Sequence, residues 1–206
     1  MNPSDALAKI AVFWGTFDPP TRAHGALLSA AIHDHGVERG IVVIHALPHK
    51  GASAPLEHRL HMLNLMLGDL NLENQVEVRV QTQKHPLGYD TLKSELGMPL
   101  AVLAGSDSFG AWVKTPEDLA PYDGVWIAAR AGSECSIVHP KVRLLTLPKE
   151  LAGLSSSCAR EALGRNQDVS AMLTPRVLEY IMASGLYRAP FDEQPVKGYS
   201  QENTYG

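Results

Sequence analysis

The sequence contains little cysteine and no long apolar run. Its two cysteines, Cys135 and Cys158, form neither a metal-binding nor a redox spacing, which fits a reducing compartment. No apolar segment approaches the ~20 residues that a membrane-spanning helix needs. The first residues, MNPSDALAKI, lack the basic and apolar regions of a secretory signal. We therefore expect a cytoplasmic protein that does not associate with membranes.

The chain also lacks an excess of positive charge. It has 18 lysines and arginines against 22 aspartates and glutamates, and a net charge of −4. A broad electrostatic interaction with nucleic acid is therefore not expected. A small anionic ligand is compatible with this composition, because a local site can be positive on an acidic protein.

Apolar segments that predict strands alternate with segments that predict helices. The strands are predicted at residues 9–14, 40–47, 75–81, 99–105, 124–130 and 142–147, and the helices at 22–36, 56–67, 89–96, 156–165 and 175–184. Gly36 and Gly68 are expected to end the first two helices. This order predicts an α/β fold, a Rossmann-like doubly wound parallel sheet in which ligands bind at the carboxyl ends of the strands.

The length of 206 residues and the absence of an internal linker predict one domain over residues 1–188, which ends with two helices. Residues 189–206 are polar and lose periodicity, so we expect a flexible or extended tail.

The loop between the first predicted strand and helix has features of an anion site. Gly15 permits close backbone approach, and a helix N-terminus offers free N–H groups and partial positive charge. Thr21 and His24 are three residues apart, about one helical turn, so their side chains can face one spot. The alternative is an ordinary capped helix with a histidine that faces the core.

The segment GTFDPPTRAH resembles the signature of the nucleotidylyltransferase superfamily, roughly G-[ST]-F-[DN]-P-x-[HT]-x-x-H. The matching residues are Gly15, Thr16, Phe17, Asp18, Pro19, Thr21 and His24. A second segment, LSSSCAREAL, resembles the I-S-S-T-x-I-R motif of the same superfamily through Ser155, Ser156, Ser157 and Arg160. Serines at a helix start also serve as ordinary N-caps, which is the alternative for this segment.

Three further segments resemble nicotinate and nicotinamide mononucleotide adenylyltransferases in particular. They are LPHK with HRLHML (residues 47–50 and 58–63), GYDTL (88–92) and LTPRVLEYIMASGLY (173–187). The resemblance covers about residues 9–188. Pantetheine-phosphate adenylyltransferases share the first and serine motifs but are shorter and lack this ending.

The resemblance implies that a pyridine mononucleotide attacks the α-phosphorus of ATP to yield a dinucleotide and pyrophosphate. His24, Thr21 and Arg160 would act on the transferring and departing phosphates. The implied ATP and phosphate contacts are Gly15, Thr16, Phe17, Ser155, Ser156, Ser157, Gly105 and Asp107. Mg²⁺ would bind through the ATP phosphates, with no metal site formed by the protein itself. Nicotinate mononucleotide is favoured as the second substrate, although the residues leave nicotinamide mononucleotide open. The sequence leaves the oligomeric state undetermined, and a homo-oligomer is one option.

The mononucleotide contacts implied by the resemblance are Lys50, Tyr89, Asp90, Thr91, Trp112 and Arg130. Several have ordinary structural alternatives: Asp107 as a helix cap, Trp112 in the core and Arg130 in a surface ion pair. Trp14 departs from the family pattern, because the first glycine of the signature usually stands there. This difference leaves two other hypotheses open: a related nucleotidylyltransferase with another phosphorylated substrate, and a regulatory protein that binds a nucleotide without catalysis.

Overall fold

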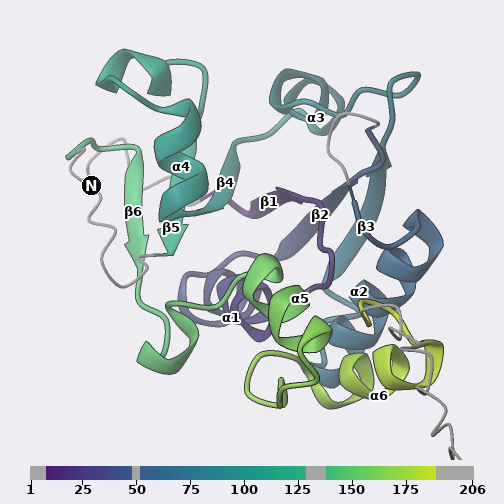
Figure 1. Ribbon diagram of the computed structural model, residues 1–206. Helices are drawn as coiled ribbons and strands as arrows, with labels where there is room; N and C mark the ends of the chain where they lie inside the picture. Colours follow the sequence, from purple (N-terminus) through teal and green to yellow (C-terminus); the bar gives the residue numbers. More distant parts are fainter. Residues whose placement is uncertain (1–7, 48–51, 129–137, 189–206) are drawn as a thin grey trace, which may run out of the picture.

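The computed structural model describes residues 8–47, 52–128 and 138–188 of the chain, and it contains a six-stranded parallel sheet (Figure 1). The order is β3-β2-β1-β4-β5-β6, and every adjacent pair is parallel. The strands are β1 (Ile10–Gly15), β2 (Arg39–His45), β3 (Val76–Gln81), β4 (Leu100–Gly105), β5 (Gly124–Ala128) and β6 (Val142–Leu145). The predicted Rossmann-like doubly wound fold is confirmed.

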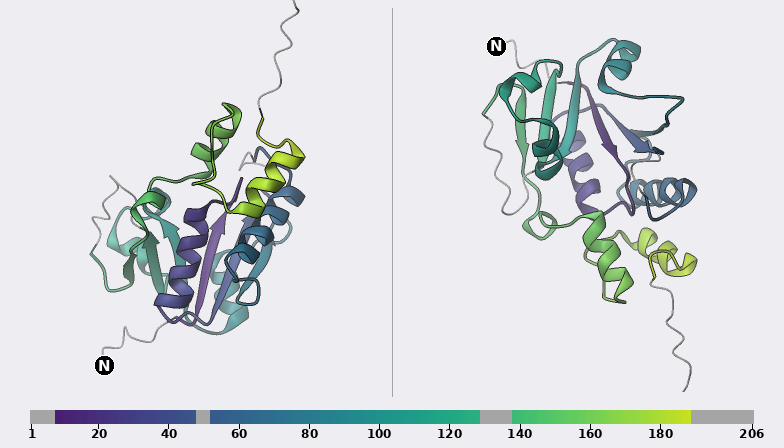
Figure 2. Two further views of the ribbon diagram at one scale, coloured as in Figure 1. Left: turned by 90° about the horizontal axis from the view of Figure 1, so that it is seen from below. Right: turned by 45° about the horizontal axis from the view of Figure 1, so that its top comes forward.

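Helices cover both faces of the sheet (Figures 1 and 2). The α-helices are α1 (Arg22–Ser29), α2 (Leu56–Asp69), α3 (Tyr89–Leu96), α4 (Ser106–Trp112), α5 (Ser156–Gly164) and α6 (Pro175–Ser184). Helices α1, α2, α5 and α6 share one core with the sheet, whereas α3 and α4 pack on the opposite face. Side chains alternate along β1, so Phe13 belongs to the first core and Trp14 packs against the clusters under α3 and α4.

The first helix begins as predicted but changes its hydrogen-bond pattern before it ends. Helix α1 continues directly into a short π-helix, η2 (Ala30–Asp34). Gly36 then adopts a positive φ of 71°. This conformation suits glycine, and Gly36 is the predicted stop.

The predicted end of the second helix is wrong. Helix α2 continues through Gly68 to Asp69, and Asn71, with a φ of 55°, takes the left-handed position. Gly68 has no positive φ, and the atom nearest to a Cβ there would be a guanidinium nitrogen of Arg176, at the far end of a flexible side chain, so neither a turn nor rigid packing requires the glycine. Strand β5 ends at Ala128, and the remainder of the strand predicted to residue 130 lies outside the described residues.

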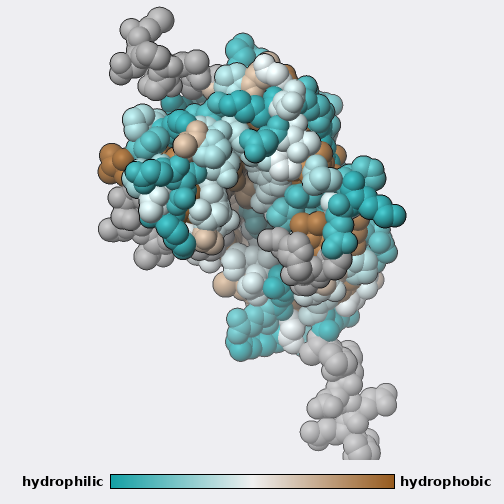
Figure 3. All heavy atoms as spheres, turned by 90° about the horizontal axis from the view of Figure 1, so that it is seen from above, coloured by the Kyte–Doolittle hydropathy of each residue, from teal (hydrophilic) through white to brown (hydrophobic). Residues whose placement is uncertain are grey.

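The strand order places the carboxyl ends of the two central strands, β1 and β4, at the edge of the sheet where ligands bind in this class of fold. The chain passes from β1 outward to β2 and β3, and then returns through α3 to β4 on the other side of β1. The connections diverge at the carboxyl ends of β1 and β4, which is where parallel sheets form a crevice. Viewed from the side where α3 and α4 lie, the surface has a hollow between two raised parts (Figure 3). In the described part of the chain, no helix is long and apolar enough to cross a bilayer.

Candidate nucleotide-binding site

The loop from Gly15 to Thr21, here called the phosphate loop, connects β1 to α1 and folds back on itself. Phe17 is 2% exposed and has a positive φ of 50°, which turns its ring under the loop. A Cβ on Gly15 would lie 2.9 Å from two atoms of that ring. The Asp18–Pro19 peptide bond is cis. Glycine at position 15 is therefore required by the close approach of Phe17.

His24 lies in the first turn of α1, where local hydrogen bonds set its orientation. The backbone N–H of Thr21 donates to Nδ1 of His24 at 2.9 Å, and the Thr21 hydroxyl lies 2.9 Å from the same atom. Because a backbone N–H can only donate, Nδ1 is an acceptor, and the proton of the neutral ring is on Nε2. The rings of Phe13 and Phe17 lie 5.7 and 5.2 Å away, centroid to centroid. His24 therefore has an oriented N–H donor.

Thr21 is fully buried at the N-cap of α1, and its hydroxyl contacts His24. In this geometry Thr21 orients the histidine. Its predicted contact with a phosphate stays a prediction.

The serine motif lies against the phosphate loop, although the residues in contact are 137 or more positions apart in sequence. Ser156 donates to the carbonyl of Pro19 at 2.8 Å, and Arg160 donates to the carbonyl of Asp18 at 2.6 Å. Arg160 also contacts the Ser157 hydroxyl at 3.2 Å. Ser155 is the N-cap of α5 and accepts from the backbone N–H of Cys158. The fold thus brings the two predicted phosphate-binding motifs together.

A buried network around Asp18 fixes the other side of the phosphate loop. The carboxylate is 3% exposed and accepts hydrogen bonds from the backbone N–H groups of Ser53 and Ala54 and from the Tyr187 hydroxyl. Arg59 is 4% exposed and donates to carbonyls on three segments: Thr16 in the phosphate loop, His45 at the end of β2, and Ala54.

The burial of this network shifts the pKa of two of its members, Arg59 and Tyr187. Burial lowers the pKa of Arg59, while Asp18 and Tyr187 act in the opposite direction. Burial and the hydrogen bond to Asp18 raise the pKa of Tyr187. Asp18, Arg59 and Tyr187 all belong to the motifs that carry the resemblance. None of the three is predicted as a site residue from the sequence, because no local pattern shows that they meet.

Two cavities open at the carboxyl ends of β1 and β4. The first, here called the phosphate cavity, has a volume of about 200 Å³. It is lined by Phe13, Trp14, Gly15, Ala23, His24, Leu27, Gly105, Ser108, Ala128, Leu147, Leu151 and Ala152. Its wall therefore contains His24 together with Gly15 and Gly105, the last residues of β1 and β4.

The second cavity, here called the aromatic cavity, has a volume of about 290 Å³ and lies under α3 and α4. It is lined by Trp14, Gln81, Gly88, Tyr89, Val102, Leu103, Ala104, Ser108, Trp112 and Tyr122. The rings of Trp112 and Tyr122 are 5.1 Å apart, and those of Tyr89 and Tyr122 are 4.8 Å apart. Aromatic walls of this kind suit a planar ring.

Asp123 holds the Tyr89 ring in the wall of the aromatic cavity. The Tyr89 hydroxyl donates to the Asp123 carboxylate at 2.7 Å, and Lys93 binds the other carboxylate oxygen at 2.6 Å. Burial and the hydrogen bond to Asp123 raise the pKa of Tyr89. The Tyr89 side chain therefore lines the aromatic cavity, while its hydroxyl is hydrogen-bonded to Asp123.

Other predicted site residues are not brought into these cavities. Asp90 and Thr91 lie on the exposed side of α3 and line neither cavity. Thr16 contributes its backbone carbonyl to Arg59. Lys50, Arg130 and the side chain of Asp107 lie outside the described residues.

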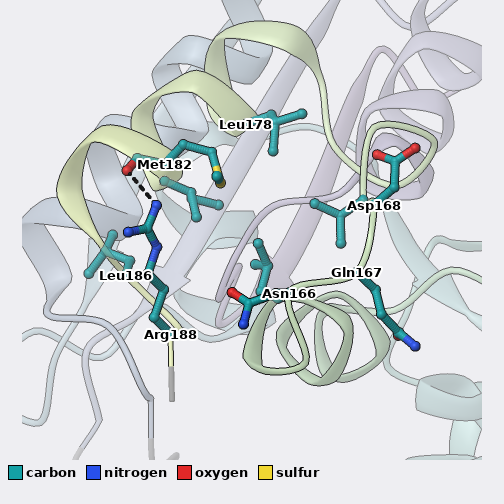
Figure 4. A pocket seen from close by; sticks show the side chains of 10 residues that line it. Asn166, Gln167, Asp168, Leu178, Met182, Leu186 and Arg188 are labelled. Atoms are coloured by element: carbon teal, nitrogen blue, oxygen red, sulfur yellow. Dashed lines mark hydrogen bonds between the residues drawn. The ribbon is translucent and has the colours of Figure 1, made fainter. Parts of the chain in front are cut away.

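A third cavity, of about 250 Å³, lies between α5 and α6 (Figure 4). Its walls include Leu178, Met182 and Leu186, with Asn166 and Arg188 among its polar residues. None of the predicted site residues lines it, so it lies apart from the candidate site. Over the described ranges, no group of three or more histidines, cysteines, aspartates or glutamates is arranged to hold a metal ion.

Fold and site together define a Rossmann-like α/β protein whose first strand leads through a tightly folded loop to a helix, beside an aromatic cavity. The family model described as cytidylyltransferase-like matches residues 12–162. This match covers most of the chain, from β1 into α5, so the protein belongs to the cytidylyltransferase-like family.

Curated relatives align along nearly their whole length. A protein of Chloroherpeton thalassium named probable nicotinate-nucleotide adenylyltransferase is 29% identical over 198 residues, covering 88% of this chain and 98% of the relative. A phosphopantetheine adenylyltransferase of Stenotrophomonas maltophilia is 29% identical over 171 residues, covering 83% and 89%. A solved structure of Plasmodium falciparum nicotinic acid mononucleotide adenylyltransferase complexed with NaAD has a TM-score of 0.71 at 22% identity, covering 86% of this chain and 96% of that one. The solved structure supports the fold.

Proposed function

We propose that this protein is an adenylyltransferase that joins ATP to a pyridine mononucleotide, with nicotinate mononucleotide favoured, and releases pyrophosphate in NAD biosynthesis. The observation that carries the proposal is the arrangement of the two cavities. The phosphate cavity, with the oriented N–H of His24, adjoins an aromatic cavity of about 290 Å³. A mononucleotide can place its planar base in the aromatic cavity and its phosphate beside His24.

The reaction needs no covalent intermediate with the protein. A phosphate oxygen of the mononucleotide forms a bond to the α-phosphorus of ATP, and the bond from that phosphorus to the bridging oxygen breaks. Pyrophosphate leaves with the electron pair. Catalysis then consists of positioning and charge stabilisation, because the attacking group is already an anion.

The described residues supply donors for this charge. His24 would donate from Nε2 to the transferring phosphate, with Thr21 holding the ring in that orientation. The N-terminus of α5, with Ser155, Ser156 and Arg160, would hold the departing pyrophosphate. A guanidinium has five N–H groups, and the contacts to Asp18 and Ser157 engage two of them.

ATP would enter as its magnesium complex. The Asp18 carboxylate already accepts three hydrogen bonds and is 3% exposed, and no acidic residue in the described part of the chain lines the phosphate cavity. These residues offer Mg²⁺ no carboxylate ligand, so the ion would be held by the triphosphate oxygens as part of the substrate.

The relatives support the choice of second substrate. Several curated relatives of this length are named probable nicotinate-nucleotide adenylyltransferase. A second candidate is the phosphopantetheine reaction, since a relative with that name is equally similar over a shorter alignment. The aromatic cavity favours a planar base over the flexible pantetheine chain.

The test is pyrophosphate release by the purified protein with ATP and Mg²⁺. Nicotinate mononucleotide, nicotinamide mononucleotide and 4′-phosphopantetheine are compared as acceptors. Turnover with a pyridine mononucleotide supports the proposal, whereas preferential turnover with phosphopantetheine contradicts it. ATP binding without turnover on any acceptor would favour a non-catalytic nucleotide-binding protein.

Replacing His24 by alanine tests the mechanism. Loss of a preorganised donor to developing charge costs about 3 kcal/mol, roughly a hundredfold in rate. We expect turnover to fall by about that factor while the protein remains folded, as checked by thermal unfolding. His33→Ala, at an exposed position in η2, is the matched control and should retain activity. Near-normal turnover of His24→Ala would contradict the proposed role.

A further inference from the structure

Trp14 occupies the position in β1 where the two cavities meet. Its side chain packs against both clusters on the α3 and α4 face of the sheet, one with Val102 and Phe109 and one with Val12 and Leu92. The side chain is half-buried, so part of the indole faces the crevice. Trp14 is thus built into the floor of the site.

The indole is held by a specific hydrogen bond. Its N–H donates to the carbonyl of Leu87 at 2.7 Å, across 73 residues of sequence. Leu87 lies in the connection from β3 to α3, directly before Gly88 and Tyr89 of the aromatic cavity. One side chain of β1 therefore fixes the segment that carries one wall of that cavity.

Trp14 also separates the two cavities. Only Trp14 and Ser108 line both of them within the described residues, and Trp14 is by far the larger of the two. Without the indole, spaces of about 290 and 200 Å³ would join, and the aromatic cavity would lose one of its four aromatic walls. The indole therefore lies at the boundary between the two cavities.

We propose that Trp14 is a specificity-determining residue, which limits the acceptor to a mononucleotide whose base is a single planar ring. The proposal rests on the proposed function, in which the base enters the aromatic cavity and the phosphate lies beside His24. In this proposal the indole supplies a wall for a six-membered ring, and a base with two fused rings would need the space that the indole occupies between the two cavities. The hydrogen bond from the indole N–H to the Leu87 carbonyl fixes the distance between the indole and the segment that carries Tyr89.

Two variants separate the contributions of the ring and of its N–H. Trp14→Phe retains an aromatic wall but loses the hydrogen bond to Leu87. Because of this loss, we expect the KM for nicotinate mononucleotide to rise about fivefold. Trp14→Gly removes the wall as well, and a rise of about tenfold or more is expected. The KM for ATP should change much less than the KM for the mononucleotide in both variants.

The discriminating measurement is the ratio of kcat/KM for nicotinate mononucleotide to that for inosine monophosphate, whose base has two fused rings. Wild type should strongly prefer the single ring, Trp14→Phe should prefer it less, and Trp14→Gly should form the dinucleotide with inosine monophosphate. Trp126→Phe is the matched control, because Trp126 lies in β5 and lines neither cavity. It should leave the ratio unchanged.

The outcomes distinguish this proposal from the proposed function. Active wild type with an unchanged ratio in both Trp14 variants would overturn the role of Trp14 alone. Silent wild type with an active Trp14→Gly variant would overturn the proposed function of the natural chain and the single-ring limit together, because Trp14 would then exclude the pyridine as well. Silence of all proteins with both acceptors would overturn both. If Trp14→Gly fails to fold in thermal unfolding, the ratio for Trp14→Phe decides.

Discussion

Replacing Tyr187 by phenylalanine tests the link between the C-terminal helix region and the phosphate loop. The hydroxyl donates to Oδ1 of Asp18 at 2.6 Å, and that carboxylate is 3% exposed. A phenyl ring keeps the shape, so the variant loses little except this bond. A hydrogen bond to a charged group contributes about 1.5–3 kcal/mol, and Oδ1 keeps the N–H of Ala54 as a second donor. We therefore expect the free energy of unfolding to fall by about 2 kcal/mol.

The assay is urea denaturation at neutral pH, compared with Tyr180→Phe as the matched control. Tyr180 lies in α6, and its hydroxyl contacts an imidazole nitrogen of His58 at 2.7 Å. That partner is not a carboxylate, so its loss should cost only about 1 kcal/mol. A larger effect at position 187 is the expected result.

A pH series adds a second check on Tyr187. Its pKa is raised in the folded protein by burial and by Asp18, so its contribution to stability is complete below the pKa of the unfolded state. Above about pH 10 the unfolded chain begins to lose the tyrosine proton, and the stability difference between wild type and Tyr187→Phe should shrink. If the variant matches wild type within about 0.5 kcal/mol at neutral pH, the contact with Asp18 does not hold the loop as described.

Two further predictions concern the loop and the aromatic cavity. Gly15→Ala should destabilise the protein by about 1–3 kcal/mol and impair turnover, because its Cβ would lie 2.9 Å from the Phe17 ring. Gly110→Ala, where a Cβ meets nothing within 4 Å, should show no such loss in the same thermal and kinetic assays. Burial acts to raise the pKa of Asp123, but hydrogen bonds, first from Lys93, outweigh it and hold that pKa below its usual value. Wild type should therefore be more stable than Asp123→Asn by about 1 kcal/mol above about pH 4, and the difference should vanish as Asp123 becomes protonated in the native state. A difference that persists in acid would contradict this assignment.

Local patterns in the sequence were sufficient for most elements of the fold. Helix α3 was predicted at residues 89–96 and α6 at residues 175–184, and both have these bounds in the structure. The predicted end of the second helix is wrong because a glycine is an ambiguous signal: Gly68 lies within the helix, and Asn71 takes the left-handed position after it. Helix α4 follows β4 without an intervening loop, and no separate prediction covered it.

The site, too, could be predicted only where its residues are close together in the sequence. Thr21 and His24 are neighbours in one helical turn, so their spacing sufficed to predict that they meet. For the predicted mononucleotide contacts, sequence spacing did not show which residues line the cavity. Tyr89 lines the aromatic cavity, whereas the adjacent Asp90 and Thr91 face away from it, because successive helical positions point in different directions.

The sequence by itself determined the alternation of strands and helices, the loop that follows the first strand, and the short-range pair at the start of α1. These features depend on periodicity, turn residues and spacing within a few positions. Tertiary structure alone decided that Tyr187 contacts Asp18 across 169 residues and that Trp14 binds Leu87 across 73. Such contacts arise when the helices and loops pack against the parallel sheet and bring segments that are distant in sequence to one edge. The shape of the site is therefore a property of the packed chain.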